Sequence, residues 1–163
     1  MSAQLVKKYE AIDAIKQRYL KRVSSVSHEK MNTIPANGGW SLGQVLFHVA
    51  YAESGTVLVI NRNLAENKVK LKSNLSGTVR HLLLVAFLRS PLKAKAPKGV
   101  SKVPESITHD EISAYFDKNT ADFKKILADL PTELENKFIF KHPVGGLFNI
   151  EHNIRCNKVG VEA

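Results

Sequence analysis

Apolar residues recur every three or four positions through most of this sequence, and this spacing restricts the fold more than any other feature. Residues 3–23 show it clearly, with Leu, Tyr, Ile and Val at i, i+3/i+4 and i+7, which is the pattern of an amphipathic α-helix. No convincing strand pattern is found, although residues 138–141 are expected to be briefly extended. The spacing therefore predicts an all-α fold.

Two pairs of residues mark where further helices begin. Ser41 precedes Gln44 by three positions, and Thr108 precedes Glu111 in the same way. This is the spacing of a capping box, in which each side chain bonds the backbone N–H of the other residue. The helices predicted from these starts cover residues 41–66 and 108–129. The apolar face of the first of them is wide enough to be packed by more than one neighbour.

Two shorter helices complete the pattern. Residues 78–89 predict a third helix that is apolar on nearly every side over 82–88, which is typical of a short, well-buried helix. Asn149 is placed to cap a last helix, for which at most about fourteen residues remain. With 163 residues, the chain is expected to form one domain over 1–163, built as an up-and-down helical bundle.

Composition places the chain among globular proteins and argues against a membrane protein. Hydrophobic residues make up 44% and charged residues 24% of the sequence, which is enough apolar material for a core. The longest strongly apolar run, 82–88, is far shorter than the ~20 residues of a membrane-spanning helix. The N-terminus has no signal-peptide pattern, and the lone Cys156 agrees with a reducing compartment. We therefore expect a cytoplasmic protein.

The net charge of +9 is concentrated in one part of the sequence. Residues 67–104 contain nine Lys and Arg and no Asp or Glu. Such a segment is suited to nucleic acid, an anionic membrane surface or an acidic small molecule, and it is equally well explained as a solvated face. Because no stacking-aromatic pattern or DNA-binding motif accompanies it, we expect no specific binding to nucleic acid.

His48 is the residue with the clearest potential for chemistry. The commonest enzyme signatures, such as a Gly-rich phosphate loop, a Cys cluster or a His-Glu-x-x-His pair, are absent. His48 lies in the middle of the predicted 41–66 helix, on a face otherwise occupied by Val45, Ala52 and Val59. An imidazole there is either a hydrogen-bonded boundary residue or one of several metal ligands converging inside a bundle.

Three segments together resemble a known family. They are 39–53 (GWSLGQVLFHVAYAE), 89–100 (RSPLKAKAPKGV) and 142–151 (HPVGGLFNIE). In this order they are similar to the signature helix, the Pro/Lys connector and the final turn of the DinB-like/YfiT-like four-helix-bundle superfamily. The resemblance covers nearly the whole chain and implies a four-helix bundle. It further implies a divalent metal, typically nickel or zinc, bound by three histidines, and a homodimer.

The resemblance assigns only one of the three metal ligands to this chain. His48 matches the histidine of the signature helix, but the His-x-x-x-His pair of the last helix would fall near Gly160 and at or beyond Ala163. Both histidines are missing. The other residues considered as replacement ligands are His142, His152 and Cys156, and nothing in their spacing supports a site.

The expected function follows from this incomplete site. We expect a DinB-like bundle of undetermined substrate, with a truncated last helix and no tightly bound metal ion. Natural loss of the metal site and an altered reading frame both fit this chain end. The first alternative is a metal-dependent thiol transferase or hydrolase, which would use nickel or zinc. The second is a non-catalytic module that binds a small-molecule or anionic ligand.

Overall fold

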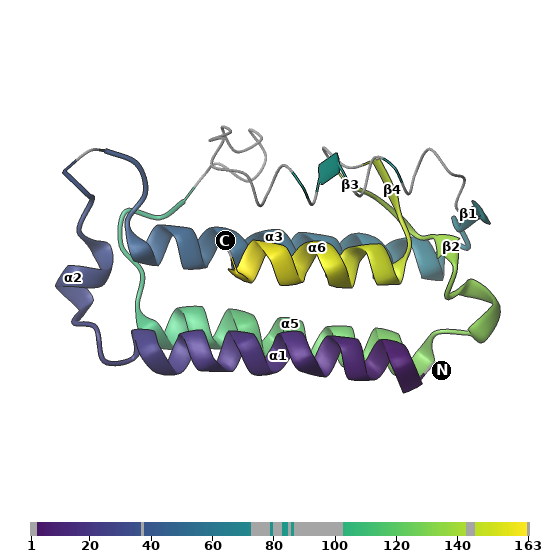
Figure 1. Ribbon diagram of the computed structural model, residues 1–163, viewed down its shortest axis with the longest axis horizontal. Helices are drawn as coiled ribbons and strands as arrows, with labels where there is room; N and C mark the ends of the chain where they lie inside the picture. The colour runs from purple at the N-terminus through teal and green to yellow at the C-terminus, as the bar shows by residue number, and fades with distance from the viewer. Residues whose placement is uncertain are drawn as a thin grey trace.

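The structure is a computed structural model that describes residues 3–36, 38–72, 79, 83, 84, 86, 103–142 and 146–162. Four long helices lie side by side and form a bundle (Figure 1). They are α1 (Ala3–Val23), α3 (Leu42–Ala65), α5 (His109–Asp129) and α6 (Ile150–Glu162). The predicted helical bundle is therefore confirmed. Most of the predicted helix over 78–89 and most of the basic segment lie outside the described residues.

The direction of the helices differs from a simple up-and-down order. In Figure 1, α3 and α5 run the same way along the bundle, whereas α1 and α6 run the opposite way. Strict alternation would need a short connection between α3 and α5. Residues 66–108 separate them instead, a connection long enough for the chain to return to the end where α3 begins.

Both predicted capping boxes are present. The Ser41 hydroxyl accepts from the Gln44 backbone N–H at 3.2 Å, and the Gln44 side chain accepts from the Ser41 N–H at 3.1 Å. Thr108 and Glu111 make the same reciprocal pair at the start of α5. Asn149 accepts from the His152 N–H at 2.8 Å and caps α6, so these three helix starts were predicted correctly.

The expectation of no convincing strand was wrong for one end of the bundle. Two short antiparallel pairs join β1 (Lys70–Lys72) to β2 (Lys137–Phe138) and β3 (Phe140–His142) to β4 (Gly146–Phe148). Strands of two or three residues are too short to show an alternating pattern, although the brief extension predicted for 138–141 is confirmed. The sequence also gave no sign of α2 (His28–Asn32), a single helical turn.

The apolar core has two parts along the bundle. The larger one lies toward the strands and includes Tyr9, Phe123 and Phe148, with the Tyr9 and Phe123 rings stacked at 4.5 Å. The smaller one lies toward α2 and includes Met31 and Phe116. None of the helices in the described residues combines the length and the hydropathy of a membrane span.

Candidate functional site

His48 lies on the flank of α3 and is half-buried. Its ring is 4.8 Å from the ring of Trp40. Glu53, which faces the bundle interior, is five residues further along the helix, and this separation corresponds to a rotation of about 140° and a rise of about 7.5 Å. On an ideal helix His48 therefore points well away from the inward face that carries Glu53.

The position of α6 beside α3 determines which residues lie level with His48. The Asn157 amide donates to Glu53 Oε1 at 3.5 Å, and the two helices run antiparallel (Figure 1). Moving five residues from Glu53 back to His48 therefore corresponds to moving five residues forward from Asn157, to Glu162. The last turn of α6, residues 159–162, reads Val-Gly-Val-Glu and contains no histidine or cysteine.

Two of the proposed replacement ligands lie at the other end of α6, around Phe148. The His142 ring stacks on Phe148 at 4.9 Å, and the His152 ring meets the edge of the same phenylalanine at 5.9 Å. Burial lowers the pKa of both histidines, and the nearby Glu151 opposes this effect at His152. Both imidazoles therefore remain neutral at neutral pH and contribute to aromatic packing.

Cys156 is also poorly suited to nucleophilic attack. It is buried on α6, and burial raises the pKa of its thiol to about 11. A thiol with such a pKa is almost entirely protonated at neutral pH, whereas the attacking form of a cysteine is the thiolate. In the part of the chain that the structure describes, no three His, Cys, Asp or Glu residues are grouped closely enough to hold a metal ion.

The most charged site in the bundle interior is an ion pair that the sequence analysis missed. Lys16 Nζ of α1 lies 2.5 Å from Glu53 Oε1 of α3, and the two side chains are only 1% and 4% exposed. The ammonium also lies 5.3 Å from the centre of the Tyr9 ring and 5.8 Å from that of Phe116. A signal was present, because Lys16 follows Ile12 by four positions and so belongs to the apolar stripe of α1.

Polar side chains from α5 and α6 complete this site. Asn119 donates to the Ala50 carbonyl at 2.8 Å and lies 3.5 Å from Glu53 Oε2, while its own oxygen accepts from the Ser54 hydroxyl at 2.7 Å. Asn157 of α6 reaches the same carboxylate. Each of the four long helices thus contributes a polar group to one buried network, with Lys16 as its cation.

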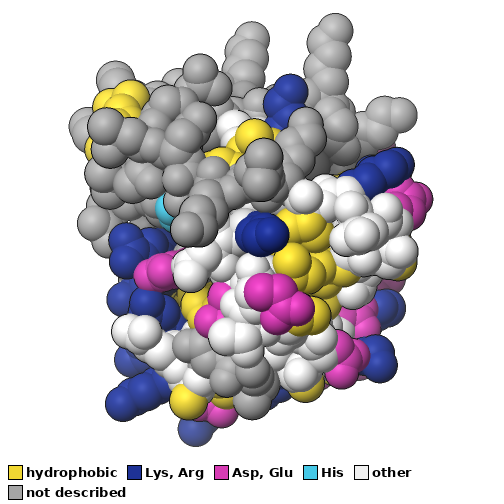
Figure 2. All heavy atoms as spheres, turned by 90° about the vertical axis from the view of Figure 1, so that its right-hand side faces the viewer, with side chains coloured by type: hydrophobic (Ala, Val, Ile, Leu, Met, Phe, Trp, Pro, Cys, Tyr) yellow, Lys and Arg dark blue, Asp and Glu magenta, His cyan; other side chains and the backbone are white. Residues whose placement is uncertain are grey.

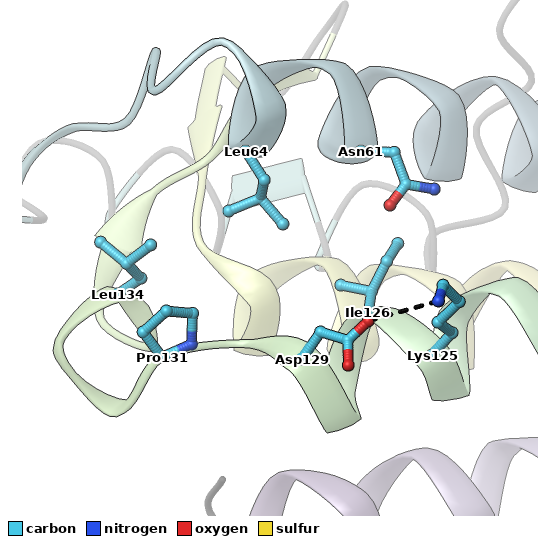
Figure 3. A pocket seen from close by; sticks show the side chains of 7 residues that line it. All are labelled: Asn61, Leu64, Lys125, Ile126, Asp129, Pro131 and Leu134. Atoms are coloured by element: carbon cyan, nitrogen blue, oxygen red, sulfur yellow. Dashed lines mark ion pairs between the residues drawn. The ribbon is translucent and has the colours of Figure 1, made fainter.

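A small hollow lies at the end of the bundle where α3 and α5 finish (Figure 3). Its volume is about 290 Å³, and its apolar wall consists of Leu64, Ile126, Pro131 and Leu134. The polar residues of its rim are Asn61, Lys125 and Asp129, with the Lys125 ammonium 3.6 Å from Asp129. Figure 2 views this end of the molecule, where apolar side chains lie among acidic and basic ones. An open hollow without histidine or cysteine is suited to weak binding and offers no nucleophile.

The comparisons with known proteins agree with this architecture. The family model of the DinB superfamily matches residues 11–157. Among solved structures, the chain is similar to YfiT from Bacillus subtilis, described as a probable metal-dependent hydrolase with an unusual four-helix bundle topology. The TM-score is 0.62 at 13% identity, over 99% of this chain and 82% of that one, so this likeness shows the fold alone. No curated protein matches the sequence significantly. Because the family model matches most of its length, the chain belongs to the DinB superfamily.

Proposed function

We propose that this chain is a degenerate DinB protein that lacks the three-histidine metal centre and acts as a binding module instead of a metal-dependent enzyme. One observation supports the proposal. Counted along the two antiparallel helices from the contact between Asn157 and Glu53, the last turn of α6 is at the same height in the bundle as His48, and that turn contains no histidine or cysteine. A catalytic zinc ion generally needs three protein ligands, and a single imidazole leaves the ion mostly hydrated.

The decisive experiment measures metal content and metal affinity. The protein, freed of any affinity tag, is stripped with a chelator, dialysed against nickel or zinc, and analysed for bound metal. We expect much less than one equivalent, and no change in that value for His48→Ala. The matched control is His28→Ala, which removes an exposed histidine of α2.

A stoichiometric ion would contradict the proposal if it depended on His48. One equivalent of nickel or zinc in the parent and in His28→Ala, but none in His48→Ala, would mean that other groups complete the site. That result would favour a metal-dependent hydrolase or thiol transferase. Because the readout is the metal itself, the experiment requires no knowledge of the substrate.

The hollow at the ends of α3 and α5 is the binding site in this proposal. Its apolar wall fits a small aliphatic group, and its rim offers an ammonium at Lys125 and a carboxylate at Asp129. These groups complement a zwitterion, so the ligand class is a small aliphatic amino acid. Both charged groups are largely exposed, so solvent screens them and the affinity is expected to be weak.

An NMR titration with L-leucine tests this site. We expect amide shifts that saturate around the ends of α3 and α5, and weaker binding to Lys125→Gln than to Lys118→Gln, which removes a similarly exposed lysine elsewhere on α5. Isocaproate has the same aliphatic body without the amine and is expected to bind less well. Equal shifts in both variants, or no shifts, would exclude the hollow as an amino-acid site.

A further inference from the structure

A helical segment outside the four-helix bundle turns apolar side chains toward solvent. The structure describes residues 79, 83, 84 and 86 as helical. Val79 is 46% exposed and Leu83 is 65% exposed, and Ala86 is exposed as well. Because these three positions follow one another at intervals of four and three, they fall within an arc of about 60° on a helix. We call them the outer stripe. The described part of this segment is therefore not buried on every side, in contrast to the expectation from its sequence.

The other side of the same segment is packed into the core. Leu84 is only 6% exposed and belongs to the larger core cluster, together with Phe140 of β3 and Phe148 of β4. It lies about 130° around the helix from the middle of the outer stripe. Rolling the segment to bury Leu83 would therefore draw Leu84 toward solvent. The core packing keeps the outer stripe exposed, and ordered apolar side chains that face solvent are typical of an interaction surface.

The outer stripe lies within the most basic part of the chain. Residues 67–104 contain nine Lys and Arg and no Asp or Glu. Glu66, which precedes them, is paired with Lys68 at 2.6 Å. The register of β1 and β2 sets Lys72 directly opposite Lys137. Like charges in such positions destabilise a strand pair, and an anion beside the strands relieves this cost.

The strands and the helical segment lie on one side of the molecule. The strands lie at the end of the bundle where α3 finishes, and α1 and α5 form the opposite layer (Figure 1). The contact of Leu84 with the cluster that includes Phe140 and Phe148 joins the segment to β3 and β4. Apolar and basic groups are thus combined on this side of the bundle.

We propose that this side of the protein docks reversibly on an anionic membrane surface, with Val79 and Leu83 inserted among the lipid headgroups. Helical segments that combine apolar residues with Lys and Arg bind membranes in this way, and anionic lipids attract basic residues near the surface. Nucleic acid matches less well, because it is bound through phosphate contacts and base stacking on aromatic rings, whereas the outer stripe is aliphatic. The docking side is distinct from the hollow, and the inference holds whether or not the protein binds a metal or an amino acid.

Co-sedimentation of the full chain with lipid vesicles tests the docking. We expect binding to vesicles of phosphatidylcholine and phosphatidylserine, little binding to phosphatidylcholine alone, and a loss of binding as salt rises. Leu83→Ser is expected to lower the partition coefficient at least about tenfold. The control is Ile34→Ser, which changes an exposed isoleucine between α2 and α3 and leaves the binding unchanged. Circular dichroism verifies that each variant is folded.

Two results of this experiment would overturn the proposal. One is the absence of binding to the anionic vesicles, including the case in which the protein binds duplex DNA instead. The other is equal binding by Leu83→Ser and the parent. The contribution of the strands is tested by Lys137→Gln, which is expected to weaken vesicle binding, whereas Lys7→Gln, at an exposed lysine of α1, is expected to have no effect.

Tryptophan fluorescence tests whether the outer stripe enters the membrane. Trp40 is the single tryptophan of the chain, so Trp40→Phe gives a background without tryptophan emission. In that background, the emission of Leu83→Trp is expected to shift to the blue on anionic vesicles and to be quenched by brominated acyl chains. Ile34→Trp is expected to show neither effect. Unchanged emission from bound Leu83→Trp would contradict insertion of the stripe.

Discussion

Lys16 of α1 and Glu53 of α3 form an ion pair at 2.5 Å in the interior of the bundle, where both side chains are almost completely buried. Asn119 of α5 and Asn157 of α6 also reach the Glu53 carboxylate. Buried charges are expensive unless they are paired and hydrogen-bonded. This pair therefore fixes how the four long helices are arranged around one point, in addition to any net stability that it provides.

Removing only the cation is expected to destabilise the protein strongly. Lys16→Met keeps an unbranched side chain between Tyr9 and Phe116 but leaves the Glu53 carboxylate buried without its counter-charge. Breaking a buried pair in this way typically costs about 3–5 kcal/mol. Urea unfolding followed by circular dichroism measures the loss.

The double variant Lys16→Met/Glu53→Met distinguishes the effect of an unpaired buried charge from the effect of altered packing. Replacing both charges by apolar groups of similar size is often neutral or stabilising, so the free energy of unfolding is expected to recover to within about 1 kcal/mol of the parent. If the double variant is as unstable as Lys16→Met, packing and not the unpaired charge explains the loss.

Removing the N-cap hydroxyl is expected to lower the free energy of unfolding by different amounts at the two capping boxes, which begin at Ser41 and Thr108. Loss of an N-cap hydroxyl typically costs about 0.5–2 kcal/mol. Ser41 is fully buried, so in Ser41→Ala no water can replace the lost hydrogen bond to the Gln44 N–H. The cost of this substitution is therefore expected at the upper end of the range. Thr108 is exposed, so Thr108→Ala belongs at the lower end. Thermal unfolding checks this order.

Acidification is expected to destabilise the fold through His142 and His152. Burial lowers the pKa of both residues, whereas in the unfolded chain they titrate near about 6.5. Below that pH the unfolded state binds protons that the folded state does not. The free energy of unfolding therefore falls as the pH drops below about 6.5, and it stops falling once the pH has passed the lowered pKa values of the folded state.

His142→Phe isolates one of the two contributions. A phenyl ring preserves the stack on Phe148 but cannot be protonated. Urea unfolding at a series of pH values is expected to give a shallower slope for this variant than for the parent. Equal slopes would mean that His142 does not contribute to the pH dependence.

The helices could be predicted from the sequence because their signals are local. Periodic apolar residues and capping pairs such as Ser41 and Gln44 act within one or two turns, and the boundaries of α3 and α5 follow from them. The parallel course of these two helices was not predictable, since it depends on where a long connection leads. The short strands were missed because β2 contains only two residues.

The candidate site was predictable only in part. The family motif identified His48 as a candidate ligand, and the sequence of α6 contains a histidine only at position 152. The ion pair between Lys16 and Glu53 was not identified, because two helical stripes each contain one charged residue and only the tertiary fold brings the two residues together. The signal that could have revealed the ion pair is a charged residue at an apolar stripe position, considered together with an opposite charge at such a position on another helix.

Cys156 is expected to resist thiol reagents in the folded protein. Its thiol is buried, and its pKa is raised to about 11, so at pH 8 about one molecule in a thousand carries the reactive thiolate, against roughly a quarter for a free cysteine. Reaction with an aromatic disulfide reagent, followed by absorbance, is therefore expected to be more than about 100-fold slower in buffer than in urea. Lys16→Met is expected to narrow this difference, because a less stable bundle exposes the thiol more often by unfolding. A native rate equal to the rate in urea would contradict the burial of Cys156 in α6.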